Sequence, residues 1–253
     1  MAIKRKLSET ELFCWNYVQD NLAKISQMTI SKVAQEAHVS ISTVNRTLNK
    51  VGYDGYSDFK HSIKNSKTYP INGFSSEVNE AFRKNETEIT RTINQLSVEE
   101  IESAIRLINR HENITLIAMG LSSNVSREMM AKLQLFNKRC TRYDDPEYMK
   151  YHAAKMNSHD LIIAISISGE TPELLETVAI AKARGAKILS LTANPSSALA
   201  SNADVSISAY KSKVRELDFG LDVASRIPLQ IVNRILIDAY AIYKQNATIR
   251  ENQ

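Results

Sequence analysis

The hydrophobic pattern divides the chain into regions with different periods. Up to about residue 70, apolar residues recur every three or four positions, which predicts short amphipathic helices. Ser8 and Glu11 have the spacing of a capping box at the start of the first helix. The apolar residues expected on the inner faces are Leu12, Trp15, Val18, Leu22, Ile30, Val33, Ala34, Ala37, Val44, Leu48, Phe59 and Ile63. This region is therefore predicted to be all-α, and Pro70, Asn72 and Gly73 mark its end.

Residues 71–106 are predicted to form linker helices. The first has one apolar stripe, made of Val78, Phe82, Ile89 and Ile93. A capping pattern at Ser97 and Glu100 starts the second.

From about residue 107, short apolar runs alternate with helical patterns. The runs that predict strands are 114–119, 139–143, 160–166, 187–192 and 204–207. Strands that alternate with helices, without two-residue hairpin turns, indicate parallel βαβ units covered on both faces. We therefore predict an α/β fold, with an all-α domain at 1–70, linker helices at 71–106 and a five-stranded parallel α/β sandwich at 107–250. The final helix, near 222–245, has apolar residues that fit either a subunit contact or its own domain's core.

Composition adds a charge asymmetry and several exclusions. Residues 1–70 hold ten Lys or Arg and six Asp or Glu, whereas the remainder holds 22 of each. Such asymmetry is typical of a polyanion partner, although ordinary scatter also produces it. The apolar runs are too short to span a membrane, so no membrane partner is expected. Two cysteines, Cys14 and Cys140, support neither a disulfide framework nor a cysteine-rich zinc site, so a cytoplasmic location is predicted.

Residues 29–50 have the spacing of a helix-turn-helix motif, which predicts double-stranded DNA as a partner. Ala34 is small where the helices must touch, and His38 replaces the usual turn glycine but tolerates a positive φ. The outward positions of the second helix are Ser42, Thr43, Asn45, Arg46 and Lys50. The complete set expected to bind DNA adds two residues, Lys32 and Ser40. A generic helical hairpin has the same pattern.

Two serine-rich loops follow predicted strands and precede helices. The first contains Gly120, Ser122 and Ser123, and the second contains Ser166, Ser168, Gly169 and Thr171. Backbone N–H groups at a helix N-terminus, with hydroxyl donors and a tight glycine turn, suit a phosphate group. Neither loop fits the P-loop or dinucleotide-binding patterns, and either could be only a helix cap.

These segments resemble two known families. The sequence HVSISTVNRTLNKVGYDGYSDFK is similar to the helix-turn-helix of the RpiR family of bacterial transcriptional regulators. The sequences MGLSSNVSREMMAKLQ and SISGETPELLETVAIAKARGAKILSLT resemble the SIS (sugar isomerase) phosphosugar-binding domain, a flavodoxin-like fold. Ser225–Arg226 and Asp238–Ala239 match the C-terminal helix of the RpiR family. The resemblance implies a homodimeric or homotetrameric regulator of sugar-catabolic genes with a phosphosugar effector.

By this resemblance, the phosphosugar-binding residues are the glycines and hydroxyls of the two loops. They are Gly120, Ser122, Ser123, Ser166, Ser168, Gly169 and Thr171. Neither loop contains Lys or Arg, so neutral donors and the helix dipole are expected to carry phosphate recognition.

The alternative function is a cytosolic phosphosugar isomerase with a helical assembly domain. Isomerisation needs a base and a ring-opening acid. The candidates, all of them explained more simply as caps or surface residues, are Glu128, His152, His159, Glu170 and Glu173. We therefore expect no catalytic residue, no cofactor and no metal site.

Overall fold

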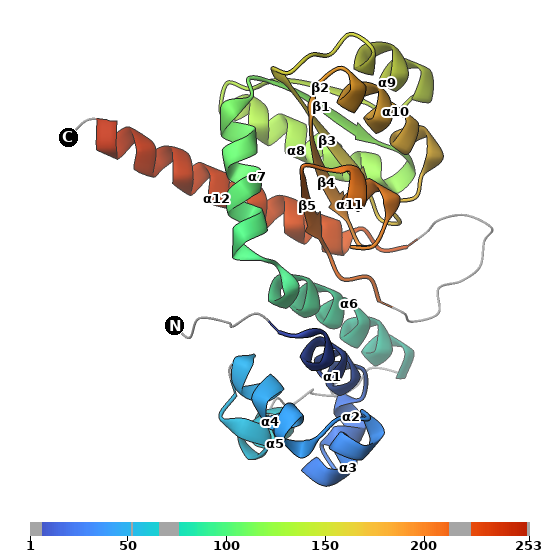
Figure 1. The fold of residues 1–253 in the computed structure, drawn as a ribbon, viewed down its shortest axis with the longest axis vertical. Helices are drawn as coiled ribbons and strands as arrows, with labels where there is room; N and C mark the ends of the chain where they lie inside the picture. Colours follow the sequence, from blue (N-terminus) through green and yellow to red (C-terminus); the bar gives the residue numbers. More distant parts are fainter. Residues whose placement is uncertain (1–6, 52, 66–75, 213–223, 252–253) are drawn as a thin grey trace. The chain divides into compact units, whose positions relative to one another are not determined.

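A computed structural model describes residues 7–51, 53–65, 76–212 and 224–251. The chain forms two compact units, Met1–Phe74 and Ser75–Gln253 (Figure 1). The break expected at residues 70–73 lies outside the described residues. None of the helices described is long and apolar enough to cross a membrane.

The first unit is all-α, as the pattern predicts. Its helices are α1 (Glu9–Asp20), α2 (Leu22–Ile25), α3 (Ile30–Glu36), α4 (Ile41–Lys50) and α5 (Gly55–Asn65). Their core consists of Cys14, Val18, Ile25, Val33, Ala34, Val44, Leu48 and Phe59. The prediction for Leu12 was wrong, because its side chain is 50% exposed while Glu11 is 1% exposed. Helix α1 thus turns a carboxylate, not a leucine, toward α4.

The second unit contains a five-stranded sheet in which every pair of neighbouring strands is parallel. The strands are β1 (Asn113–Ala118), β2 (Arg139–Tyr143), β3 (Asp160–Ser166), β4 (Lys187–Thr192) and β5 (Val205–Ser208). Their order is β2-β1-β3-β4-β5. The order in which the strands are added reverses between β1 and β3, because β2 lies on one side of β1 and the later strands lie on the other. Ligands of open parallel sheets bind at such a switch point.

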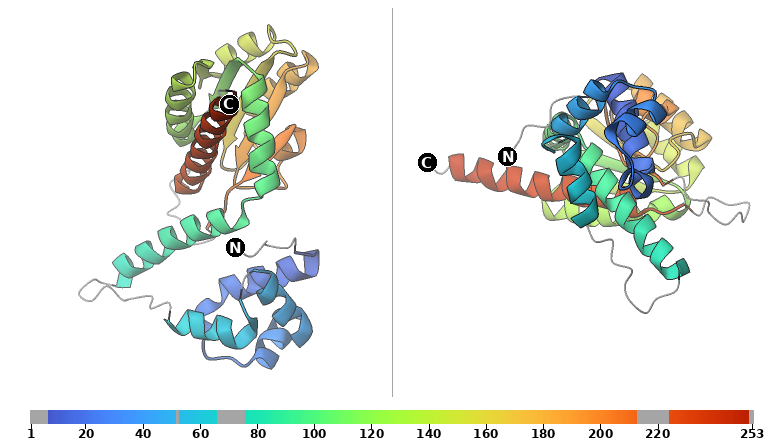
Figure 2. Two further views of the ribbon diagram at one scale, coloured as in Figure 1. Left: turned by 90° about the vertical axis from the view of Figure 1, so that its left-hand side faces the viewer. Right: turned by 90° about the horizontal axis from the view of Figure 1, so that it is seen from below.

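Helices cover both faces of this sheet, which confirms the predicted sandwich. Helices α7 (Val98–Arg110), α8 (Ser123–Leu135) and α12 (Ile227–Glu251) pack on one face, with Leu161, Ile163 and Ile165 of β3 beneath them. Helices α9 (Pro146–Ala153), α10 (Pro172–Ala183) and α11 (Ala198–Asn202) pack on the other, over Ile162 and Ala164 (Figures 1 and 2). Strand β3 reads as one apolar run because successive side chains enter the two layers in turn.

The helices expected as a linker belong to the second unit. Helix α6 (Ser76–Gln95) packs along α12, and α7 packs on β4 and β5. The buried side of α6 is polar, with Glu88 at 1% and Thr92 at 0% exposure. In the apolar stripe identified from the sequence, Phe82 and Ile93 are 52% and 49% exposed. Tertiary packing of α6 has therefore selected a face about a quarter-turn away from the apolar one.

Candidate functional site

The first candidate site is the pair of helices α3 and α4. The Thr29 hydroxyl accepts the N–H of Lys32 at 3.3 Å, and the Ser40 hydroxyl accepts the N–H of Thr43 at 3.1 Å, so each helix has its own N-cap. Between them, His38 has a φ of 51°, as predicted for the turn position. Ala34 is 4% exposed, where a small residue lets the helices meet. The segment therefore has helix-turn-helix geometry.

Four of the residues expected to bind DNA are exposed. They are Lys32, Ser40, Ser42 and Arg46. The Arg46 side chain is 61% exposed, and the Ser40 and Ser42 hydroxyls lie 2.7 Å apart. Lys32 pairs with Glu36 at 3.5 Å.

The other three are held within the unit. Thr43 was expected to face outward, but it is 7% exposed and its hydroxyl bonds that of Ser40 at 2.8 Å. Asn45 accepts the N–H of Tyr56 through Oδ1 at 3.1 Å, which ties α4 to α5. Lys50 is 24% exposed, with Nζ 2.7 Å from Glu11 Oε2.

Glu11 is a residue whose role at this surface sequence reasoning missed. Its Oε1 lies 2.9 Å from Arg46 Nε, and its Oε2 accepts both Lys50 Nζ and the backbone N–H of Ser8 at 2.7 Å. The Lys50 ammonium, and then the Ser8 N–H, lower the pKa of Glu11 from 4.5 to about 2. The capping-box pattern did indicate the bond to Ser8, but nothing in it indicated the two cations.

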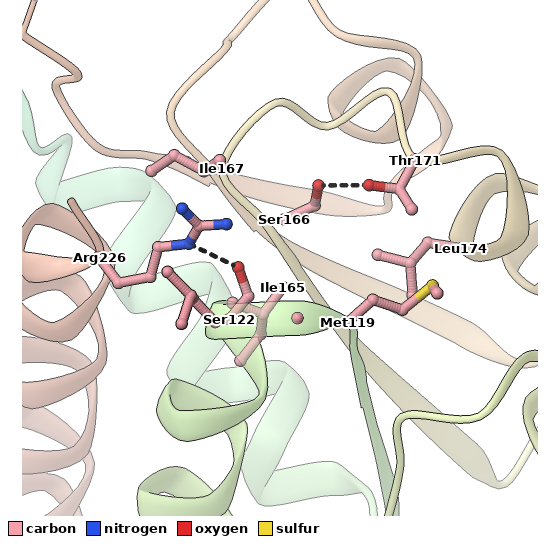
Figure 3. A pocket seen from close by; sticks show the side chains of 10 residues that line it. Met119, Ser122, Ile165, Ser166, Ile167, Thr171, Leu174 and Arg226 are labelled. Carbon is pink, nitrogen blue, oxygen red and sulfur yellow. Dashed lines mark hydrogen bonds between the residues drawn. The ribbon is translucent and has the colours of Figure 1, made fainter. Parts of the chain in front are cut away.

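The second candidate site is a cavity of about 470 Å³ at the carboxyl ends of β1 and β3 (Figure 3). It is lined by Met119, Gly120, Leu121, Ser122, Ile165, Ser166, Ile167, Thr171, Leu174 and Arg226. The lining thus combines apolar side chains with the hydroxyls of two serines and one threonine. The cavity lies at the switch point of the sheet.

The second serine-rich loop shapes one side of this cavity. The Ser166 hydroxyl accepts the N–H of Gly169 at 3.1 Å and lies 3.1 Å from the hydroxyl of Thr171. Thr171 is the N-cap residue of α10, so that hydroxyl stands beside the positive end of the helix. Gly169 has a φ of 67°, and a Cβ there would lie 2.2 Å from Ser197 Oγ. The tight turn requires glycine for conformation and for space.

Arg226 supplies a positive charge that the two loops lack. Its Nε donates to Ser122 Oγ at 3.2 Å, and its Nη1 donates to the carbonyl of Ala224. Figure 3 shows the guanidinium beside Ser122 and Ile167, across the cavity from Ser166 and Thr171. The two loops themselves contain no Lys or Arg, and the cation at this cavity comes from a residue outside them. The match of Ser225–Arg226 to the RpiR family was the available signal.

The structure brings together four of the seven predicted loop residues. Gly120, Ser122, Ser166 and Thr171 line the cavity, whereas Ser123, Ser168 and Gly169 do not. Ser123 is 8% exposed and donates to the carbonyl of Ala118 at 3.1 Å. The exposed hydroxyl of Ser168 accepts the N–H of Glu170 at 3.2 Å. These two serines stabilise the loops that carry the lining residues.

The side chains considered for acid–base chemistry lie elsewhere. Glu170 accepts the N–H of Ala198 at 2.9 Å, Glu128 pairs with Lys132 at 3.1 Å, and the His152 ring stacks on Tyr143 at 4.3 Å. Among the residues described, no three His, Cys, Asp or Glu side chains are grouped to hold a metal ion.

Comparisons with known proteins identify both domains. The model of the rpiR-family helix-turn-helix domain matches residues 2–68, and the SIS domain model matches residues 106–232, half of the chain. An uncharacterized HTH-type transcriptional regulator of Caldanaerobacter subterraneus is 26% identical over 99% of this chain and 93% of its own length.

Two solved structures share the fold. The Vibrio vulnificus NanR protein, complexed with ManNAc-6P, has a TM-score of 0.60 and 21% identity over 97% of this chain and 92% of its own. The sugar isomerase domain of an RpiR transcription factor from Sphaerobacter thermophilus has a TM-score of 0.62 and 23% identity over 70% of this chain and 98% of its own. With a helix-turn-helix unit ahead of a SIS domain, the chain belongs to the RpiR family of transcriptional regulators.

Proposed function

We propose that this regulator binds operator DNA of sugar-catabolic genes through α4, and that a phosphorylated sugar bound in the SIS cavity is its effector. The observation that carries the effector assignment is the convergence of Arg226, Ser122, Ser166 and Thr171 on one cavity. NanR, which shares the fold along nearly the whole chain, was solved with a sugar phosphate.

The cavity combines the groups that a phosphate monoester requires. Arg226 supplies a guanidinium, whose planar donors match phosphate oxygens. The N-terminus of α10 adds the positive end of a helix dipole, and the hydroxyls supply further donors. Met119, Leu121 and Leu174 offer apolar walls to the C–H faces of a sugar ring.

We propose further that the SIS domain is a sensor and not an isomerase. Aldose–ketose isomerisation moves a proton between two carbons, and a carboxylate or imidazole normally does this. The described lining residues contain neither group. A guanidinium is a donor of hydrogen bonds without an acceptor, so Arg226 is suited to bind an anion and not to act as a base.

The DNA-binding surface is proposed to consist of the exposed residues Lys32, Ser40, Ser42 and Arg46, with Lys50 adding positive charge at the end of α4. Arginine is suited to guanine edges in the major groove, and hydroxyls to either base or phosphate. One helix-turn-helix unit makes few contacts with DNA, so we propose that the protein is a homo-oligomer that binds two half-sites of an operator. We propose a cytoplasmic location for it.

The decisive experiment uses the full-length protein on random and genomic duplexes. We expect enrichment of one palindromic sequence, with an affinity that changes when the effector is added. A thermal-shift screen of sugar phosphates identifies the effector, because ligand at about 100 times its Kd adds ~2.7 kcal/mol of stability. The same panel is then followed by NMR for turnover. Conversion of a sugar phosphate without sequence-selective DNA binding would favour the isomerase instead.

A further inference from the structure

Buried Glu11 connects α1 to the exposed side of α4. Both of its oxygens are engaged: Oε1 by Arg46 Nε at 2.9 Å, and Oε2 by Lys50 Nζ and the Ser8 N–H at 2.7 Å. The two cations are four residues apart on α4, so they stand one above the other on one side of the helix. One carboxylate, 1% exposed, thus holds two residues of the proposed DNA surface.

Arg46 contacts Glu11 through one nitrogen, while most of its side chain stays exposed. The contact with Glu11 uses Nε, at the inner edge of the guanidinium, while the side chain as a whole is 61% exposed. The two terminal amino groups form the outer end of the same rigid plane. Such an end-on fork matches the O6 and N7 acceptors of a guanine in the major groove.

We propose that Glu11 is a positioning residue for DNA recognition: it fixes the plane of the Arg46 guanidinium and thereby determines which base pair α4 accepts. The inference rests on the proposed DNA-binding function. A fork that is already oriented loses less conformational freedom on binding than a mobile surface arginine, and the gain falls on the one base pair that fits it.

The negative charge of Glu11 lowers the overall affinity for DNA, while its proposed positioning role raises discrimination between base pairs. These opposite effects make the inference testable. A carboxylate beside two cations weakens attraction to phosphates, which is the sequence-independent part of DNA affinity. Removal of the negative charge therefore strengthens binding to any duplex if Glu11 only offsets charge. If Glu11 positions Arg46, the same removal also weakens discrimination at one base pair.

The experiment compares Glu11→Gln with a matched control, Glu9→Gln. Glu9 lies in the first turn of the same helix and is exposed, so the control removes the same charge away from α4. Fluorescence anisotropy of the full-length protein gives Kd values on the selected operator, on its single-base-pair variants and on a random duplex. We expect Glu11→Gln to bind the random duplex at least as tightly as wild type, and to lose most of the roughly 5- to 150-fold discrimination at one base pair. Glu9→Gln should keep that discrimination.

A double-mutant cycle identifies Arg46 as the group through which Glu11 acts. Once Arg46→Ala has removed the fork, Glu11→Gln should change discrimination no further. Arg46→Lys keeps the charge but lacks the fork, so it should lose the same base pair. Because Arg46→Lys leaves Glu11 in place, it tests the fork even where Glu11→Gln fails to fold. The Arg46 Nε–H signal in NMR spectra of the free wild-type protein should exchange slowly.

Three results would overturn the inference: unchanged discrimination in Glu11→Gln, an equal loss at every base pair, or the same effect of Glu11→Gln with and without Arg46. An Arg46 Nε–H that exchanges like free arginine would also overturn it. A wild-type protein that selects no sequence contradicts the proposed DNA-binding function itself. A wild-type protein that selects one, while Glu11→Gln discriminates normally, contradicts only the role of Glu11.

Discussion

Arg226 provides the sharpest test of the effector site, because it is the cationic residue among those lining the cavity in the described part of the chain. Arg226→Met keeps the apolar stem and removes the guanidinium, including the Nε that lies 3.2 Å from Ser122 Oγ. A charge-assisted hydrogen bond contributes ~1.5–3 kcal/mol. The variant should therefore bind a phosphorylated sugar about 10- to 150-fold more weakly. Arg226→Lys should fall between the two, since an ammonium keeps the charge without the planar fork.

Isothermal titration calorimetry with two ligands separates phosphate binding from other roles of Arg226. The ligands are the sugar phosphate that most stabilises the wild-type protein and the same sugar without its phosphate. Arg226→Met should lose affinity for the first and change by less than about two-fold for the weakly binding second. A matched control is Arg234→Met, which removes an exposed arginine of α12, the helix that Arg226 precedes; Arg234 is paired with Asp238 at 2.7 Å. Its affinities should equal those of wild type.

Two outcomes would refute this reasoning. Equal losses for both ligands would place Arg226 against the sugar or in the support of the cavity, and no loss would remove it from the site. Thermal melting of each variant checks that the SIS domain remains folded. A melting temperature like that of wild type is expected, because Arg226 is only partly buried.

Further predictions concern the fold and the assembly. Gly169→Ala should destabilise the protein by about 2–5 kcal/mol in urea titrations followed by circular dichroism, whereas Gly120→Ala, with φ 54° and nothing within 4 Å of the new Cβ, should cost only ~1–2 kcal/mol; equal losses would contradict the close contact. Because its folded-state pKa is depressed, Glu11 stabilises the first unit above pH 4.5, and this stabilisation should be lost as the pH falls from 4.5 towards 2. Fluorescence of Trp15, the single tryptophan, follows that unit, and an identical acid transition in Glu11→Gln would disprove the link. Light scattering should show that the wild-type protein is an oligomer. The substitution Ile242→Asp, at a 58% exposed position of α12, should dissociate this oligomer, and a monomeric wild type would contradict the prediction.

The sequence predicted those features of the fold that are determined by residues close together in the chain. The apolar run of β3 predicted a strand with both faces covered, and both faces are covered. The caps Thr29 and Ser40 and the turn residue His38 predicted a helix-turn-helix, because each acts on its immediate neighbours. The serine loops were placed correctly at the strand ends for the same reason.

What local patterns could not predict are contacts between segments far apart in sequence. Arg226 meets Ser122 across 104 positions, and Lys50 meets Glu11 across 39. Neither pairing leaves a spacing that can be recognised in the chain. Thr43 shows a smaller limit: helical periodicity placed it on the outward face, but it is 7% exposed and its hydroxyl bonds that of the Ser40 cap.

The position of Arg226 has a mechanical consequence. It immediately precedes α12, a helix of 25 residues that is about 37 Å long and extends beyond the layers of its domain (Figures 1 and 2). A ligand that draws the guanidinium away from Ser122 therefore applies a force at the first turn of this long helix. A tilt of about 5° at the first turn displaces the far end by roughly 3 Å, which is larger than the shifts of ~1–2 Å that helices undergo at subunit interfaces in allosteric transitions. Helix α6 packs along α12 and, in sequence, directly follows the segment that leads from the helix-turn-helix unit.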